Sequence, residues 1–150
     1  MTNNGLEVVH QLALQRLNND FAYYLDHNHV ELLTDLFTKD AYYRHGIRES
    51  RGRDEIRQLF IERATSGKRL ARHVISGLRL DSNGEHSATG NSVVVTWAAN
   101  GSLPVAGTVP HLVADFTDEY HLCDDARWRI NKREIERIFV APGNQGPIGS

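Results

Sequence analysis

Residues 69–99 read RLARHVISGLRLDSNGEHSATGNSVVVTWAA, and this stretch decides the fold. Apolar and polar residues alternate over 69–81 and again over 87–99, which is typical of two half-buried strands. The turn sequence Asp81-Ser-Asn-Gly84 lies between them, so the two strands are predicted to pair as a hairpin. The pattern therefore places an antiparallel pair of long strands at the centre of the chain.

Two more strands are predicted after this hairpin, at residues 108–121 and 126–140. Because sequential strands usually pair as neighbours, we expect a four-stranded meander with mostly antiparallel pairing. The residues before the hairpin show helical spacing instead, with apolar side chains three and four positions apart. The segments predicted there are helices at 5–26, 29–37 and 52–67, and a short strand at 40–46.

Helices that precede an antiparallel sheet define the α+β class. A strongly curved sheet closed on one side by three helices makes a cone with an interior pocket. We predict one domain over residues 1–140. Residues 141–150 (APGNQGPIGS) are rich in Gly and Pro and are predicted to form a flexible tail.

The composition is that of a soluble globular protein, with 150 residues, 40% hydrophobic, 24% charged and one cysteine. No apolar run approaches the ~18 residues that a membrane span needs. The N-terminal residues lack the pattern of a signal peptide, so we expect a cytoplasmic protein. A net charge of −2 does not favour nucleic acid. The sequence has no phosphate-binding loop, dinucleotide fingerprint or zinc-type spacing, so neither a cofactor nor a metal is expected.

Positive charge is concentrated between Arg44 and Arg72. This stretch has nine Lys and Arg against four Asp and Glu, a net charge of +5, and the rest of the chain carries −7. One interpretation is a solvated helix with its flanks. The other is a basic rim that attracts an anionic substrate.

Asp26 and His73 are the first candidates for chemistry. Asp26 ends the first predicted helix, and alternation places His73 on the same face of its strand as Ile75. Ser76-Gly77, next in this strand, would suit a β-bulge, which re-aims side chains and is frequent near active sites. A histidine that exchanges a proton near pH 7 needs a partner that fixes its tautomer and supports its cationic form, and a buried carboxylate does this. The two could form such a pair. The alternatives are a helix-capping Asp26 and a core His73.

Other side chains are candidates with open alternatives. His45 closes the short strand and enters the pocket if Tyr43 does, or lies half-exposed at the strand end. Tyr24 and Tyr43 could donate hydrogen bonds to a substrate or could pack in the core. Asp115 lies mid-strand, facing either a substrate, water or a second subunit. Arg133 is either a cation for an anionic group or an exposed strand residue.

At this point the sequence resembles the SnoaL-like branch of the nuclear transport factor 2-like superfamily, over roughly residues 6 to 140. The stretches that carry the resemblance are YLDHNHVELLTDLFTKDAY (24–42), HVISGLRLD (73–81), SATG (87–90), TDEY (117–120) and WRINKR (128–133). The resemblance implies the cone-shaped, cystatin-like fold. It also implies a homodimer and a small-molecule substrate of aromatic, polyketide or steroid-like type.

Members of this branch include scytalone dehydratase, bile-acid dehydratase and hexachlorocyclohexane dehydrochlorinase, which eliminate water or HCl without a cofactor. They share an Asp near the end of the first helix and a His on the first long strand, and Asp26 and His73 stand at these positions. Arg133 looks like the arginine of the dehydrochlorinase. His45 stands where the dehydratases have a Tyr.

Two further family positions are altered here. Phe21 replaces the lysine of the dehydrochlorinase, and Ala98 falls near the second histidine of scytalone dehydratase. The resemblance thus makes Phe21 and Ala98 candidate substrate-binding residues. The ketosteroid isomerase pattern, a Tyr near Phe21 and an Asp near His45, is also missing. The resemblance thus implies an Asp–His dyad without naming a substrate.

Together these observations favour a cofactor-independent lyase or isomerase. In this hypothesis His73 is the general base and Asp26 orients it. His45, Tyr24 or Tyr43 polarises the leaving group or a carbonyl, and Arg133 stabilises negative charge. Two alternatives remain: a non-catalytic binding or dimerisation module, and the small subunit of a ring-hydroxylating dioxygenase.

Overall fold

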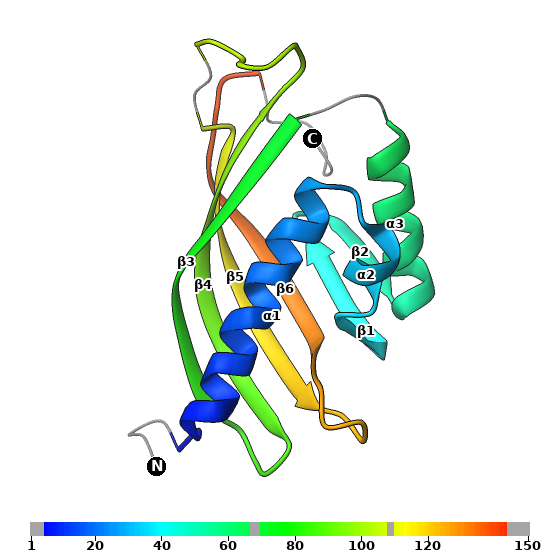
Figure 1. The fold of residues 1–150 in the computed structure, drawn as a ribbon, viewed down its shortest axis with the longest axis vertical. Helices are drawn as coiled ribbons and strands as arrows, with labels where there is room; N and C mark the ends of the chain where they lie inside the picture. Colours follow the sequence, from blue (N-terminus) through cyan, green and yellow to red (C-terminus); the bar gives the residue numbers. More distant parts are fainter. Residues whose placement is uncertain (1–4, 67–69, 108–109, 144–150) are drawn as a thin grey trace.

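The computed structural model describes residues 5–66, 70–107 and 110–143 (Figure 1). Helices and strands occur in the order expected for an α+β protein. Their bounds are α1 Val8–Asp26, α2 Val30–Thr34, β1 Phe37–His45, β2 Arg48–Arg51, α3 Arg53–Thr65, β3 Leu70–Ser82, β4 Ser87–Ala99, β5 Leu112–Leu122 and β6 Trp128–Val140. None of the described helices is long and apolar enough to cross a membrane.

The strands form one six-stranded sheet in the order β2-β1-β6-β5-β4-β3. The four long strands make the predicted antiparallel meander, while β1 joins β6 in parallel and carries β2 on its other edge. The sheet curves around α1. Helices α2 and α3 lie beside the end of the sheet that β1 and β2 form (Figure 1). This confirms the predicted curved sheet with three helices on one side.

The core lies between α1 and the inner face of the sheet. Helical spacing gives α1 one buried stripe that includes Leu14, Leu17, Phe21 and Leu25. On β5, residues are alternately buried and exposed from Leu112 to Tyr120, because successive side chains of a strand point to opposite faces. The alternation read from the sequence therefore decides which face of each strand reaches the core.

A β-bulge lies in β3, where the sequence Ser76-Gly77 had suggested one. The pairing of β3 with β4 shifts register between Ser76 and Arg79, and Gly77 has φ +65°. A bulge adds one residue to a strand and so resets the alternation. His73 consequently stays on the inner side above the bulge, and Leu80 is buried below it.

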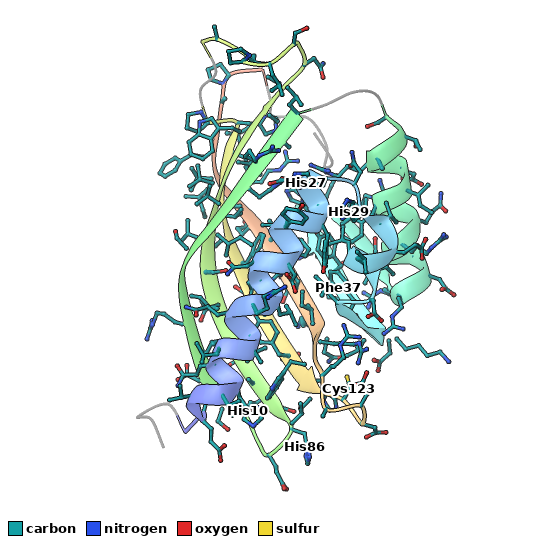
Figure 2. The ribbon with its side chains drawn as sticks, viewed as in Figure 1. His10, His27, His29, Phe37, His86 and Cys123 are labelled. Carbon is teal, nitrogen blue, oxygen red and sulfur yellow. The ribbon has the colours of Figure 1, made fainter. Side chains whose placement is uncertain are left out.

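The structure corrects the prediction of a helix over 29–37. Helix α2 ends at Thr34, and Phe37 begins β1. The ring of Phe37, labelled in Figure 2, packs against those of Phe21, Tyr43 and Phe60. A short apolar run fits either period, so tertiary packing rather than local pattern sets this boundary.

Strand β2 is absent from the sequence prediction for a related reason. Its four residues, RESR, include no apolar side chain, so no alternation marks them. The strand exists because a turn at Gly46, with φ +62°, brings it against β1. The predicted helix end at Gly67, the start of the 108–121 strand and most of the 141–150 tail fall outside the described residues; β5 begins at Leu112.

Candidate functional site

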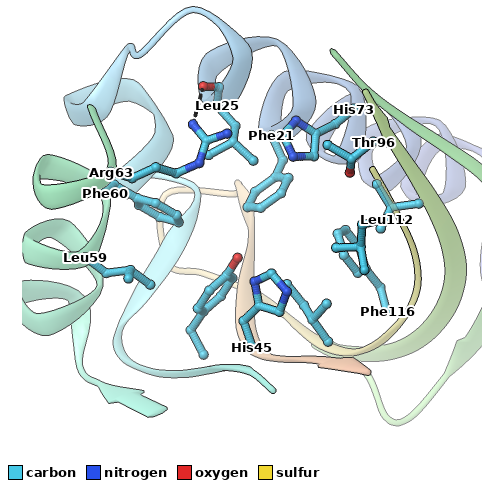
Figure 3. Close-up of a pocket in the computed structure, with 13 residues that line it drawn as sticks. Phe21, Leu25, His45, Leu59, Phe60, Arg63, His73, Thr96, Leu112 and Phe116 are labelled. Atoms are coloured by element: carbon cyan, nitrogen blue, oxygen red, sulfur yellow. Dashed lines mark hydrogen bonds between the residues drawn. The ribbon is translucent and has the colours of Figure 1, made fainter. Parts of the chain in front are cut away.

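A cavity lies between α1, α3 and the inner face of the sheet (Figure 3). Its volume is about 50 Å³, counted as space for the centres of water molecules. That is room for several waters, so the occupant is small. The lining residues are Phe21, Leu25, Tyr43, His45, Leu59, Phe60, Arg63, His73, Val94, Thr96, Leu112, Phe116 and Ile135.

The structure brings Asp26 and His73 together at this cavity. Asp26 is the last residue of α1, which packs against β3. Its Oδ1 lies 2.5 Å from His73 Nδ1, and its Oδ2 accepts a hydrogen bond of 3.0 Å from the His73 backbone N–H. Both oxygens thus bind the same residue, which fixes the carboxylate relative to the ring.

This geometry decides the tautomer of His73. A carboxylate only accepts hydrogen bonds, so the neutral ring carries its proton on Nδ1 and its basic lone pair on Nε2. The side chains of Asp26 and His73 are only 5% and 12% exposed. His73 lines the cavity, and Figure 3 shows its ring directed into it. The pair can therefore take a proton from a molecule in the cavity and support the resulting imidazolium.

His45 enters the same cavity from the end of β1 (Figure 3). Its Nε2 is buried and has no hydrogen-bond partner among the described residues. Burial, together with the nearby charges of Arg137 and His73, lowers the pKa of His45 to about 4. His45 is therefore neutral at pH 7 and acts as a hydrogen-bonding group rather than as a cation.

Tyr43 and Phe21 also line the cavity, as their selection from the sequence anticipated. Tyr43 is 4% exposed, and its burial raises its pKa to about 12. It remains a neutral phenol over the physiological range. Its ring packs edge-on against Phe60, so this residue combines a core role with a place at the site.

Three other predicted residues lie away from this cavity. Tyr24 is half-buried and its ring lies near Tyr23 and His29. Ala98 borders a separate open hollow between the ends of β3 and β4. Asp115 is exposed on the outer face of the sheet, because it alternates with the buried residues of β5.

Arg133 is deeply buried and is not among the cavity-lining residues. Its Nε and Nη2 donate to Asp118 at 2.8 and 2.9 Å, and Nη2 also donates to Asn18 at 2.5 Å. Tyr120 donates to Asp118 at 2.6 Å and accepts from Asn18. We call these four residues the buried ion-pair cluster. The rings of Phe21 and Phe116 lie on the guanidinium, 4.5 and 4.3 Å away, between it and the cavity they line.

Arg63 and Thr96 line the cavity although the sequence analysis did not select them as site residues. Arg63 follows Leu59 and Phe60 at helical spacing, so the apolar stripe of α3 contained the signal. Thr96 is the cross-strand partner of His73, and its buried Oγ1 has no hydrogen-bond partner within the described part of the chain. Finding it required the strand register.

Metal ligands do not gather in the described parts of the chain. Within residues 5–66, 70–107 and 110–143, no three His, Cys, Asp or Glu side chains are placed to hold an ion. His27 and His29, labelled in Figure 2, are exposed near the C-terminal end of α1.

Comparison with known proteins identifies the family. The profile of the SnoaL-like domain matches residues 7–134. The chain belongs to the SnoaL-like domain family. No curated protein matches it significantly.

Solved structures support the SnoaL-like assignment and its cystatin-like fold. A candidate scytalone dehydratase from Novosphingobium aromaticivorans is 25% identical over 89% of this chain and 87% of its own, with a TM-score of 0.78. A Nostoc punctiforme protein of unknown function with a cystatin-like fold is 22% identical over 91% and 97%, with a TM-score of 0.77. The beta subunit of a candidate aromatic-ring-hydroxylating dioxygenase from N. aromaticivorans is 14% identical over 91% and 94%, with a TM-score of 0.76.

Proposed function

We propose that this SnoaL-like protein is an enzyme that removes a C–H proton from a small molecule without a cofactor. The observation that carries this proposal is the contact of Asp26 with His73 at the edge of a partly enclosed, mostly apolar cavity. The expected reaction is a dehydratase-type elimination or an isomerisation. The likeness to a candidate scytalone dehydratase supports the first of these.

His73 is the general base in this mechanism. Its Nε2 takes the proton from a carbon activated by a neighbouring carbonyl, and the charge of Asp26 stabilises the imidazolium. In an elimination, the electron pair of the broken C–H bond forms a double bond and expels hydroxide from the next carbon, and the imidazolium supplies the proton that makes it water. In an isomerisation, the same proton returns at another carbon.

Neutral donors around the cavity support the developing charge. Tyr43 keeps its phenol proton because its pKa is raised to about 12. His45 is neutral at pH 7 and offers a ring nitrogen that is buried without a partner in the described chain. Hydrogen bonds to a developing oxyanion are stronger in a site with little water than in bulk solvent.

Mutation of the dyad tests the proposal. The wild type is screened against single-ring β-hydroxy ketones, with the absorbance of the conjugated product as the readout. For any substrate found, His73→Gln and Asp26→Asn should each lower kcat/KM, the His73 change by about 10²- to 10⁴-fold. Asp115→Asn, on the outer face of the sheet, is the matched control and should retain full activity. Wild-type turnover by His73→Gln would refute the assignment.

The second candidate is a non-catalytic subunit, because the fold also resembles a dioxygenase beta subunit. A non-catalytic subunit would not need the contact between Asp26 and His73.

A homodimer through the outer sheet face, where Val74 and Val93 are 50% and 38% exposed, remains part of our proposal. Light scattering of the purified chain measures its mass. A dimer is expected, and a monomer contradicts this part.

A further inference from the structure

Arg63 brings a positive charge to a cavity whose other walls are mostly apolar. Eight of the thirteen lining residues are Phe, Leu, Val or Ile, and no acidic residue of the described chain is among the lining residues. The remaining side chains there are a phenol, a hydroxyl and two imidazoles. Within the described residues, the cavity lining therefore presents positive charge and neutral hydrogen-bonding groups, and the Asp26 carboxylate contacts the His73 ring.

The basic stretch from Arg44 to Arg72 divides into two kinds of residue. Arg48 pairs with Glu62 at 2.6 Å and Arg57 with Glu31 at 2.6 Å, and both of these pairs are exposed. Other members also bind outside the cavity: Arg44 to Glu134, Arg51 to Glu49 and Arg53 to the carbonyl of Phe37. The solvated-surface interpretation fits the exposed Arg48, Arg51 and Arg57. Arg44 and Arg53 are half-buried, and Arg63 lines the cavity.

The position of Arg63 is tied to the dyad. Its Nη1 donates a hydrogen bond of 3.2 Å to the carbonyl oxygen of Leu25, the residue before Asp26 (Figure 3). Leu25, Arg63 and His73 all line the cavity. A group bound at the guanidinium therefore lies near the end of α1 from which Asp26 reaches His73. The lowered pKa of His45, to which Arg63 also contributes, shows that positive charge is felt across the cavity.

We infer that the substrate is a small ring compound with one carboxylate, which binds Arg63 while the ring lies among Phe21, Phe60 and Phe116. The planar guanidinium matches a carboxylate in shape and charge. The cavity is small, about 50 Å³ counted as space for the centres of water molecules, so the compound has no more than one ring. This inference names the substrate class of the proposed function and rests on it. Arg63 balances the substrate charge, so the anion does not oppose loss of a proton to His73.

Binding of matched probes tests the inference without turnover. Calorimetry at pH 7.5 compares benzoate with benzamide, which has the same shape and no charge. The wild type should bind benzoate at least tenfold more tightly than benzamide. Arg63→Gln should abolish that preference and Arg63→Lys should retain part of it. Arg57→Gln, an arginine on the solvent side of the same helix, is the control and should bind like the wild type.

The outcomes separate this inference from the proposed function. Equal affinity for the two probes, no binding of either, or an unchanged benzoate preference in Arg63→Gln would overturn the carboxylate assignment. A preference for benzoate that is retained in Arg63→Lys shows that the positive charge, and not a change in the fold, determines the effect of Arg63→Gln. Benzoate binding is measured on the wild type without turnover, so a preference for benzoate together with full turnover in His73→Gln would refute the general base and leave the carboxylate site standing.

Discussion

Two buried pairs of an acidic and a basic side chain lie against α1 in different surroundings. Asp26–His73 joins the end of α1 to β3, and Asp118–Arg133 joins β5 to β6 with Asn18 of α1 alongside. The first pair borders a cavity. Both side chains of the second pair are 0% exposed, and its arginine lies against the rings of Phe21 and Phe116.

The difference shows that the chemistry of such a pair depends on whether its basic member is a histidine or an arginine, and on whether a ligand can reach it. Burial alone would lower the pKa of Arg133, but the charge and hydrogen bonds of Asp118 outweigh burial, so this pKa is raised. The guanidinium is therefore permanently charged and cannot exchange a proton. An imidazole gains and loses its proton near neutral pH. The cavity pair is thus suited to catalysis and the enclosed pair to holding the core.

The largest effect on stability is expected from the enclosed pair. Asp118→Asn leaves the charge of Arg133 buried and uncompensated, which typically costs about 3–5 kcal/mol in the free energy of unfolding. Urea denaturation measures the loss. The control Asp115→Asn, exposed on the same strand, should stay within about 0.5 kcal/mol of the wild type. A loss below about 1 kcal/mol in Asp118→Asn would contradict the structural role of the pair.

A smaller, pH-dependent effect is expected from His45 at the cavity. In the unfolded chain this imidazole takes up a proton as the pH falls through about 6.5, whereas in the folded protein it resists until about 4. The unfolded state then binds more protons, so acid favours unfolding in this window. Between pH 7 and 4.5 the wild type should lose about 2 to 3 kcal/mol more stability than His45→Gln.

Denaturation curves of both proteins at the two pH values measure this difference. The comparison between proteins cancels the carboxylates that titrate in the same range. Parallel losses in the wild type and in His45→Gln would show that His45 is solvated and charged in the folded state, contrary to its buried position.

The smallest effect is expected from an ion pair at the surface. Arg57 and Glu31 lie 2.6 Å apart, but their side chains are 46% and 72% exposed. Water and salt screen such charges, so Arg57→Gln should leave the denaturation midpoint unchanged within experimental error. A marked shift of the midpoint would mean that the contact between α2 and α3 depends on this pair. The exposed pair would then contribute to stability as the buried Asp118–Arg133 pair does.

The candidate site was predictable from the sequence only in part. The residue pattern selected Asp26, His73, His45 and Tyr43, and the family resemblance added Phe21; all of them lie at or beside the cavity. Local features mark these residues, since each stands at the end of an element or on the inner side of one. Asp115, Tyr24 and Arg133 were selected from the pattern and Ala98 from the resemblance, but none of these lines the cavity. The curvature of the sheet and the strand register decide which positions converge.

The sequence by itself determined the fold class, the four long strands, the bulge at Ser76-Gly77 and the alternation of two faces along each strand. These features follow from the period of apolar residues and from turn chemistry, which act over a few residues. Only the tertiary structure decided that Asp26 meets His73 across 47 positions, that Arg63 enters the cavity and that Arg133 is enclosed. Periodicity shows that a side chain points inward. Whether it then meets a partner or a cavity depends on the packing of segments far apart in the chain.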